Sequence, residues 1–121
     1  MIGKLRIATI WSSDLNNLLP FYRDTLGLKV GIEGDGFIAF GDVSTPSLAL
    51  GTHSDVKGAN GDPARHMVGL DTDDIDADYE RLKGAGVEFV EEPNTTPDRS
   101  LRIATFKDPE GNLVQLLQFK S

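Results

Sequence analysis

The sequence predicts an α+β fold of two tandem βαβββ modules, and three observations support this prediction. Short apolar, β-favouring segments are separated by turns rich in Gly, Asp and Pro, which is typical of strands with tight connections. Two other segments carry apolar residues at helical spacing after an acidic cap. The order strand, helix, strand, strand, strand occurs twice along the chain, which indicates an internal repeat.

Composition sets the class of protein. The 121 residues are 39% hydrophobic and 26% charged, with a net charge of −7 and no cysteine. These values are typical of one folded domain, here residues 1–121. The acidic charge disfavours nucleic acid and mildly favours a cationic ligand. No apolar run approaches the roughly 20 residues of a membrane span, and no signal peptide is recognised, so we expect a cytoplasmic protein with no membrane partner.

The first module covers about residues 4–52. A strand is predicted at 5–11, and a helix at 15–26 follows the cap candidates Ser12, Ser13 and Asp14. Pro20 lies inside this helix and should kink it or start a second turn, because proline lacks the backbone N–H. Three strands are then predicted at 28–32, 37–40 and 47–52, with turns at 34–36 and 41–46.

A linker at about 53–63 leads to the second module at about 64–119. The predicted elements are a strand at 65–71, a helix capped by Asp73 or Asp74 and running to about Lys83, and a strand at 87–91. A proline-rich loop at 92–100 follows. The last two strands flank the turn Asp108-Pro109-Glu110-Gly111-Asn112, in which proline fixes φ and glycine permits a positive φ. Asp14, Gly27 and Phe40 correspond by position to Asp74, Gly86 and Phe106 in this second module.

The segments FYRDTLGL in the first module and DPEGN in the second, at this spacing, resemble the vicinal oxygen chelate superfamily. This superfamily includes glyoxalase I, extradiol dioxygenases, fosfomycin-resistance enzymes and bleomycin-resistance proteins. The resemblance covers about Leu5 to Phe119. It implies paired βαβββ modules that form a half-open, barrel-like sheet around a cleft, and it implies a homodimer.

The resemblance also implies where metal ligands would stand. Metal-dependent members carry a ligand on the first strand of each module, seven residues before the helix cap, and these positions hold Ile7 and Met67. A third ligand is expected three residues after the Asn of the DPxGN turn, at Gln115, and a fourth at the matching position, Ala49. Divalent metals in such sites prefer imidazole or carboxylate ligands. The sequence therefore predicts no metal and no cofactor.

The same comparison with the superfamily predicts which residues line the cleft. If Ile7 faces the cleft, alternation along its strand places Thr9 and Trp11 there too. In the second module, the same rule places Gly69 and Asp71 on the cleft side together with Met67. Trp11 is open to two interpretations, a core aromatic or a stacking surface for a planar or cationic ligand. Polar anchors are expected from Asp71, Gln115 and Arg102. The predicted ligand-binding residues are Ile7, Thr9, Trp11, Ala49, Met67, Gly69, Asp71, Arg102 and Gln115.

These observations predict a metal-free protein that binds a small, partly aromatic molecule in an apolar cleft, similar to the bleomycin-resistance proteins. One alternative is a metal-dependent lyase or dioxygenase with an atypical site built on His66, Asp71 and Gln115. This alternative requires a one-residue register slip that turns His66 inward. A further alternative is a metal-free isomerase or epimerase-like catalyst that uses Asp71 as its base.

Overall fold

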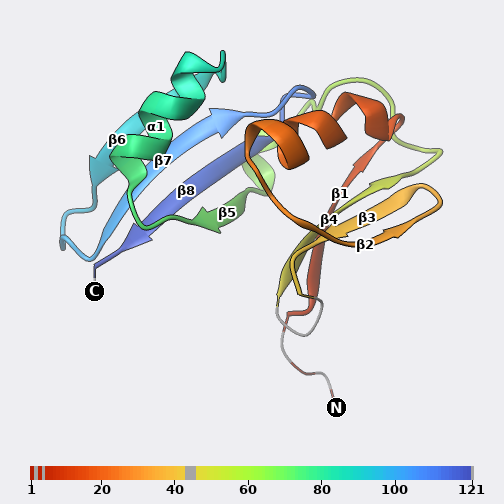
Figure 1. Ribbon diagram of the computed structural model, residues 1–121, viewed down its shortest axis with the longest axis horizontal. Helices are drawn as coiled ribbons and strands as arrows, with labels where there is room; N and C mark the ends of the chain where they lie inside the picture. Colours follow the sequence, from red (N-terminus) through yellow and green to blue (C-terminus); the bar gives the residue numbers. More distant parts are fainter. Residues whose placement is uncertain (2, 4, 43–45, 121) are drawn as a thin grey trace. The chain divides into compact units, whose positions relative to one another are not determined.

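A computed structural model describes residues 1, 3, 5–42 and 46–120. The chain divides into two compact units, Met1–Gly58 and Ala59–Ser121, and the boundary falls within residues 53–63. Each unit holds one four-stranded sheet (Figure 1). The predicted α+β class is confirmed, and neither of these two sheets closes into a barrel.

The first sheet contains β1 (Ile7–Ser12), β2 (Val30–Gly34), β3 (Phe37–Phe40) and β4 (Ser47–Thr52). Its strand order is β1-β4-β3-β2, with β1 parallel to β4 and the other pairs antiparallel. The strand predicted at 28–32 is displaced to 30–34, because Gly34 still pairs with Phe37 and the turn is shorter than expected. Residues 43–45 of the connection expected at 41–46 lie outside the described residues.

The helical part of the first unit is split, as Pro20 predicts. A 3₁₀ turn at Leu15–Asn17 is capped by the Asp14 carboxylate, which accepts from the Asn16 N–H. A π-helical segment follows at Phe21–Thr25, directly after Pro20. The expected interruption at Pro20 is therefore confirmed, since proline cannot continue the α-helical hydrogen bonds.

The second sheet contains β5 (Val68–Asp71), β6 (Phe89–Thr95), β7 (Leu101–Lys107) and β8 (Leu113–Phe119), in the order β5-β8-β7-β6. Helix α1 (Ile75–Gly84) is capped by Asp74, whose carboxylate accepts from the Ala77 N–H. The equivalent strand orders of the two sheets confirm the internal repeat.

Three predicted strand boundaries in the second unit were wrong, one of them being the strand expected from residue 87, which begins at Phe89. The strand expected from residue 65 begins at Val68, because Pro63–Arg65 forms a 3₁₀ turn. The loop expected at 92–100 is shorter, since β6 continues through Pro93 to Thr95. Proline is tolerated there because β6 is an edge strand of its sheet, where a missing N–H need not leave a carbonyl unpaired.

Each sheet has one face covered by the helical element of its own unit. In the first unit, the fully buried Tyr22 packs beside Phe40, with ring centroids 6.4 Å apart. In the second unit, α1 lies over the sheet and buries Ile75 and Leu82 (Figure 1). The Gln118 side chain of β8 accepts a hydrogen bond from the Ile75 N–H at 2.8 Å. On each sheet, the face opposite its own helical element carries several of the predicted ligand-binding residues.

The DPEGN turn is held by its first residue. The Asp108 carboxylate is buried and accepts hydrogen bonds from the backbone N–H groups of Glu110 and Asn112, both at 2.9 Å, and from the Asn112 side chain at 2.8 Å. Gly111 has a φ of 81°, a conformation that favours glycine. The turn therefore fixes how β8 leaves β7, and with it the position of Gln115.

Candidate functional site

Four of the predicted residues share one face of the first sheet. Ile7, Thr9 and Trp11 alternate along β1, and Ala49 is the β4 partner of Thr9. Residues paired across neighbouring strands point to the same side of a sheet. The alternation rule therefore brings Ile7, Thr9, Trp11 and Ala49 together on the face opposite the helical segments.

Trp11 forms an aromatic platform on this face. Its side chain is 45% exposed, so it is not the core aromatic that one interpretation expected. The indole lies against Gly51 so closely that a Cβ added there would stand 2.5 Å from Trp11 Cζ3. The absence of a side chain at Gly51 is what lets the ring lie on the strand, with part of its surface left to solvent.

His53 supports the indole from the side. The two rings meet edge to face, with centroids 5.6 Å apart and an interplanar angle of 75°. The His53 Nδ1 accepts a hydrogen bond from the Asp55 N–H at 3.1 Å. A neutral imidazole with this bond carries its proton on Nε2. The sequence places His53 in the linker and in no metal-ligand position, and its distance from Trp11 along the chain hides their contact.

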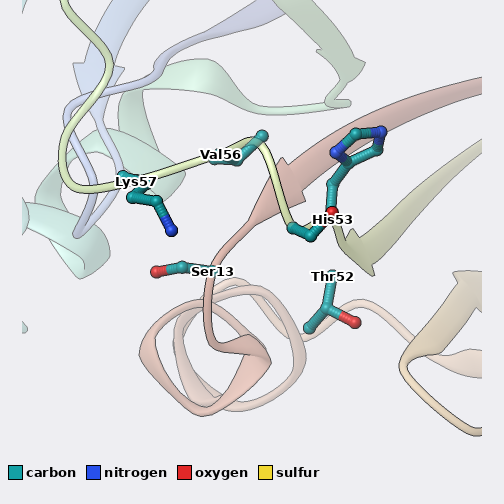
Figure 2. A pocket seen from close by; sticks show the side chains of 6 residues that line it. Ser13, Thr52, His53, Val56 and Lys57 are labelled. Atoms are coloured by element: carbon teal, nitrogen blue, oxygen red, sulfur yellow. The ribbon is translucent and has the colours of Figure 1, made fainter.

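A pocket of about 420 Å³ adjoins His53 in the same unit. Figure 2 shows the Lys57 amine directed toward Ser13, while the His53 ring points to the other side of the loop. The pocket thus offers hydroxyl groups and one ammonium, and it shares His53 with the aromatic platform. Its lining residues are Ser13, Thr52, His53, Ser54, Val56 and Lys57. Sequence analysis missed it because the loop after β4 carries no motif.

A second group of predicted residues shares the face of the second sheet opposite α1. Gly69 is the β5 partner of Gln115, and Asp71 follows two residues later on the same strand. Met67 stands directly before β5 and is 41% exposed. Gln115 is half-buried, whereas Asp71 is exposed.

Two polar residues that the sequence did not single out lie beside Gln115. Thr105 on β7 pairs with Gln115 on one side and with Glu91 on the other. Its buried hydroxyl donates to the Glu91 carboxylate at 3.3 Å. Glu91 sits at a register irregularity of β6, a feature that often redirects a side chain beside a site. The pairing of β6, β7 and β8, which is a tertiary feature, was needed to find this row.

Arg102 does not lie with Gln115. Its strand partner is Gln118, so it points to the face covered by α1. There its guanidinium donates to the Asp76 carboxylate, and this hydrogen bond lowers the pKa of Asp76 and raises that of Arg102. Side-chain alternation thus separates Arg102 from the residues with which the sequence grouped it.

The side chains at the four expected metal positions do not fit a divalent ion. Ile7 and Ala49 have no donor atom, the Met67 thioether is a poor ligand for hard cations, and the Gln115 amide is a weak one. His66, which the rival site requires, follows the 3₁₀ turn and is exposed. Within residues 1, 3, 5–42 and 46–120, no group of three or more His, Cys, Asp or Glu side chains is placed to hold a metal.

Comparison with known proteins decides the family. Residues 4–116 match the model of the Glyoxalase/Bleomycin resistance protein/Dioxygenase superfamily. The chain belongs to this superfamily. The resemblance drawn from the FYRDTLGL and DPEGN segments is thereby confirmed.

Two solved structures of similar length resemble this superfamily member. One is a Glyoxalase/bleomycin resistance protein/dioxygenase superfamily member from Sphaerobacter thermophilus, with 29% identity, a TM-score of 0.76, and coverage of 97% of this chain and 98% of the other. The other is TnmS3, an antibiotic binding protein from Streptomyces sp. CB03234, with 28% identity, a TM-score of 0.76 and 98% coverage of both chains.

Among curated sequences, a probable lactoylglutathione lyase of Vibrio cholerae is 26% identical over 119 residues, which cover 88% of this chain and 84% of the relative. The superfamily thus presents both a binding protein and a probable lyase as relatives of this chain. None of the helices in the described part of the chain is long and apolar enough to cross a membrane.

Proposed function

We propose that this superfamily member is a metal-free small-molecule-binding protein that takes a partly aromatic ligand in an apolar cleft. The observation that carries the proposal is the half-exposed Trp11 ring. The ring lies against Gly51 and makes an edge-to-face contact with the His53 ring. A planar ring stacked on such a platform gains about 0.5–1.5 kcal/mol beyond the effect of burying its area. TnmS3, an antibiotic binding protein of the same fold, supports the same class of function.

The surroundings of Trp11 suit an apolar ligand with polar substituents. Ile7 and Phe37 lie on the same face of the sheet, Phe37 being the β3 partner of Gly51. His53, which meets Trp11 edge to face, also lines a pocket that contains hydroxyls and the Lys57 ammonium. Ligand sites commonly combine an apolar lining with a few polar groups that orient the ligand.

The rival function is a metal-dependent lyase, which the Vibrio cholerae relative favours. It requires several nitrogen or carboxylate ligands at one site, whereas the expected positions hold Ile7, Ala49, Met67 and Gln115. The donor chemistry of these side chains therefore supports binding without metal catalysis.

A ligand screen tests the proposal. Trp11 is the only tryptophan, so its fluorescence reports events at the platform. We expect planar aromatic compounds to change Trp11 emission and to raise the melting temperature, because a ligand that binds only the native state stabilises it. Calorimetry on Trp11→Leu should show weaker binding of the same compound, and Trp11→Phe should restore part of the affinity.

Two results would contradict the proposal. One is a set of planar compounds that bind wild type and Trp11→Leu equally well. The other is about one equivalent of divalent metal per chain by mass spectrometry, with lyase activity that disappears on chelation and returns on reloading.

A further inference from the structure

A pocket of about 320 Å³ lies at one end of the second sheet, where β6 turns into β7 and β8 ends. Figure 1 shows the loop between β6 and β7 beside the end of β8. The Lys120 N–H joins the two by donating to the Ser100 carbonyl at 3.0 Å. Within the loop, the Thr96 N–H donates to the Leu101 carbonyl at 2.9 Å. Every residue that lines the pocket belongs to the second unit, so the site is complete within Ala59–Ser121.

Three cationic side chains line this pocket, although the chain as a whole carries a net charge of −7. They are Arg99, Arg102 and Lys120. Arg102 is paired with the Asp76 carboxylate of α1. Within residues 1, 3, 5–42 and 46–120, no carboxylate forms an ion pair with Arg99 or Lys120. The pocket therefore offers a guanidinium and an ammonium to an anionic ligand.

The turn before β7 holds Arg99 in a conformation that arginine seldom adopts. Its φ is 63°, in the left-handed region that favours glycine. The neighbouring Asp98 carboxylate stabilises the turn, since it accepts from the Thr96 hydroxyl at 2.8 Å and from the Ser100 N–H at 3.0 Å. It also accepts from the Ser100 hydroxyl at 2.8 Å, so its charge is engaged with the turn. An arginine at a position that favours glycine supports a use for the guanidinium.

Leu101 and Phe119 give the pocket an apolar wall. The two residues are directly paired across β7 and β8, so their side chains lie next to each other on one face of the sheet. Phe119 is 62% exposed, which leaves most of its ring open to contact. Cationic donors beside an apolar surface are complementary to a molecule that has an anionic group on an apolar body.

From this arrangement we propose that the pocket binds a small organic acid, with its carboxylate at Arg99 and Lys120 and its apolar body against Phe119. The guanidinium donates to the carboxylate oxygens, and the ammonium adds a second positive charge. The inference goes beyond the proposed function, because it names a binding site built from the second unit alone. It does not rest on the Trp11 platform of the first unit.

Three probes test the chemistry of the pocket. Cyclohexanecarboxylate has both the charge and the ring, cyclohexylmethanol lacks the charge, and acetate lacks the ring. Titrations of nitrogen-15-labelled protein at pH 7 follow the amide signals of Ser100, Leu101 and Lys120. We expect the cyclohexane acid to bind about fivefold more tightly than either of the other two, because an exposed charged contact and a small apolar burial each contribute on this scale. Added salt should reduce its preference over the alcohol, since salt screens exposed charges.

A double variant, Arg99→Gln with Lys120→Gln, removes both charges. It should lower the affinity for the cyclohexane acid to that for the alcohol and leave the affinity for the alcohol unchanged. Lys83→Gln with Lys107→Gln is the control. It makes the same change in net charge at the last residues of α1 and β7, outside the pocket lining, and should keep the preference. Because Arg99 and Lys120 are exposed, their replacement should leave the melting temperature within a degree or two.

Three results would overturn the inference. They are equal binding of the cyclohexane acid and the alcohol, equal binding of the acid and acetate, and a double variant at Arg99 and Lys120 that keeps the preference for the acid. None of these measurements uses Trp11, so failure of the aromatic platform would leave their interpretation unchanged.

Discussion

Gly51→Ala perturbs the aromatic platform without touching the indole itself. Gly51 lies within β4, and its backbone supports the Trp11 ring. A Cβ at this position would stand 2.5 Å from Trp11 Cζ3 and 2.8 Å from Cε3. Carbon atoms in contact prefer about 3.5–4.0 Å, so the ring must move by roughly 1 Å.

Two opposing effects determine the change in stability. Overpacking typically costs about 1–3 kcal/mol, but Trp11 is half-exposed and can tilt toward solvent. Replacing glycine by alanine also reduces the freedom of the unfolded chain, which stabilises the fold by about 0.4–1 kcal/mol. We expect a net loss of about 1 kcal/mol, which lowers the melting temperature by roughly 4 °C for a domain of this size.

The effect on binding should exceed the effect on folding. A tilted ring loses its edge-to-face contact with His53 and no longer offers a flat surface. Loss of stacking worth about 0.5–1.5 kcal/mol weakens the affinity about twofold to tenfold. The assays are the Trp11 emission spectrum, the melting temperature, and calorimetry with 1-(hydroxymethyl)naphthalene.

Gly61→Ala is the control, since a Cβ at Gly61 meets no atom within 4 Å. It should leave emission and affinity unchanged. The reasoning is refuted if Gly51→Ala gives the same emission spectrum and the same affinity as wild type, because the ring would then not depend on the open space at residue 51.

Three further predictions concern stability and assembly. Leu82→Ala should lower the free energy of unfolding by about 2–5 kcal/mol in urea titrations, because this side chain on the buried side of α1 is 1% exposed; a loss below 1 kcal/mol would contradict this packing. Hydrogen bonds from Ser100 and from the Thr96 hydroxyl lower the pKa of Asp98, so its contribution to stability is present above the ordinary carboxyl pKa and is lost as the pH falls through the lowered folded-state pKa. Asp98→Asn should therefore flatten the acid side of the melting-temperature profile below about pH 4, and a profile identical to wild type would refute this role. The homodimer implied by the resemblance should give twice the chain mass in light scattering at micromolar concentration, which a monomeric mass would contradict.

The helix cap at Asp14 and the break at Pro20 were predicted correctly because both depend on local backbone chemistry. The type of helix after Pro20 was not predicted, since several short helical forms are compatible with the same apolar spacing. The extension of β6 through Pro93 was also missed. Whether a proline can lie in a strand depends on the edge position of that strand, which the strand order alone reveals.

The candidate site shows the same division between local and distant effects. Period-two alternation correctly grouped Ile7, Thr9 and Trp11, because they lie on one strand. Arg102 was grouped with Gln115 among the ligand-binding residues, but it pairs with Gln118 and lies on the opposite face of the sheet, which follows from a register that the sequence does not specify. Glu91 was overlooked for the same reason, since only the pairing of β6 with β7 brings it beside Thr105.

By itself the sequence predicted the superfamily and the two βαβββ modules, and the resemblance to that superfamily identified Ile7, Ala49, Met67 and Gln115 as the residues at the expected metal-ligand positions. These conclusions depend on residue type, on spacing and on turn chemistry, all of which are local. Only the tertiary structure decided that Trp11 is a supported, half-exposed platform and that Gln115 belongs to a row with Thr105 and Glu91. Those features arise from strand register and from the space left by a glycine on a neighbouring strand, and neither is written in any single segment of the chain.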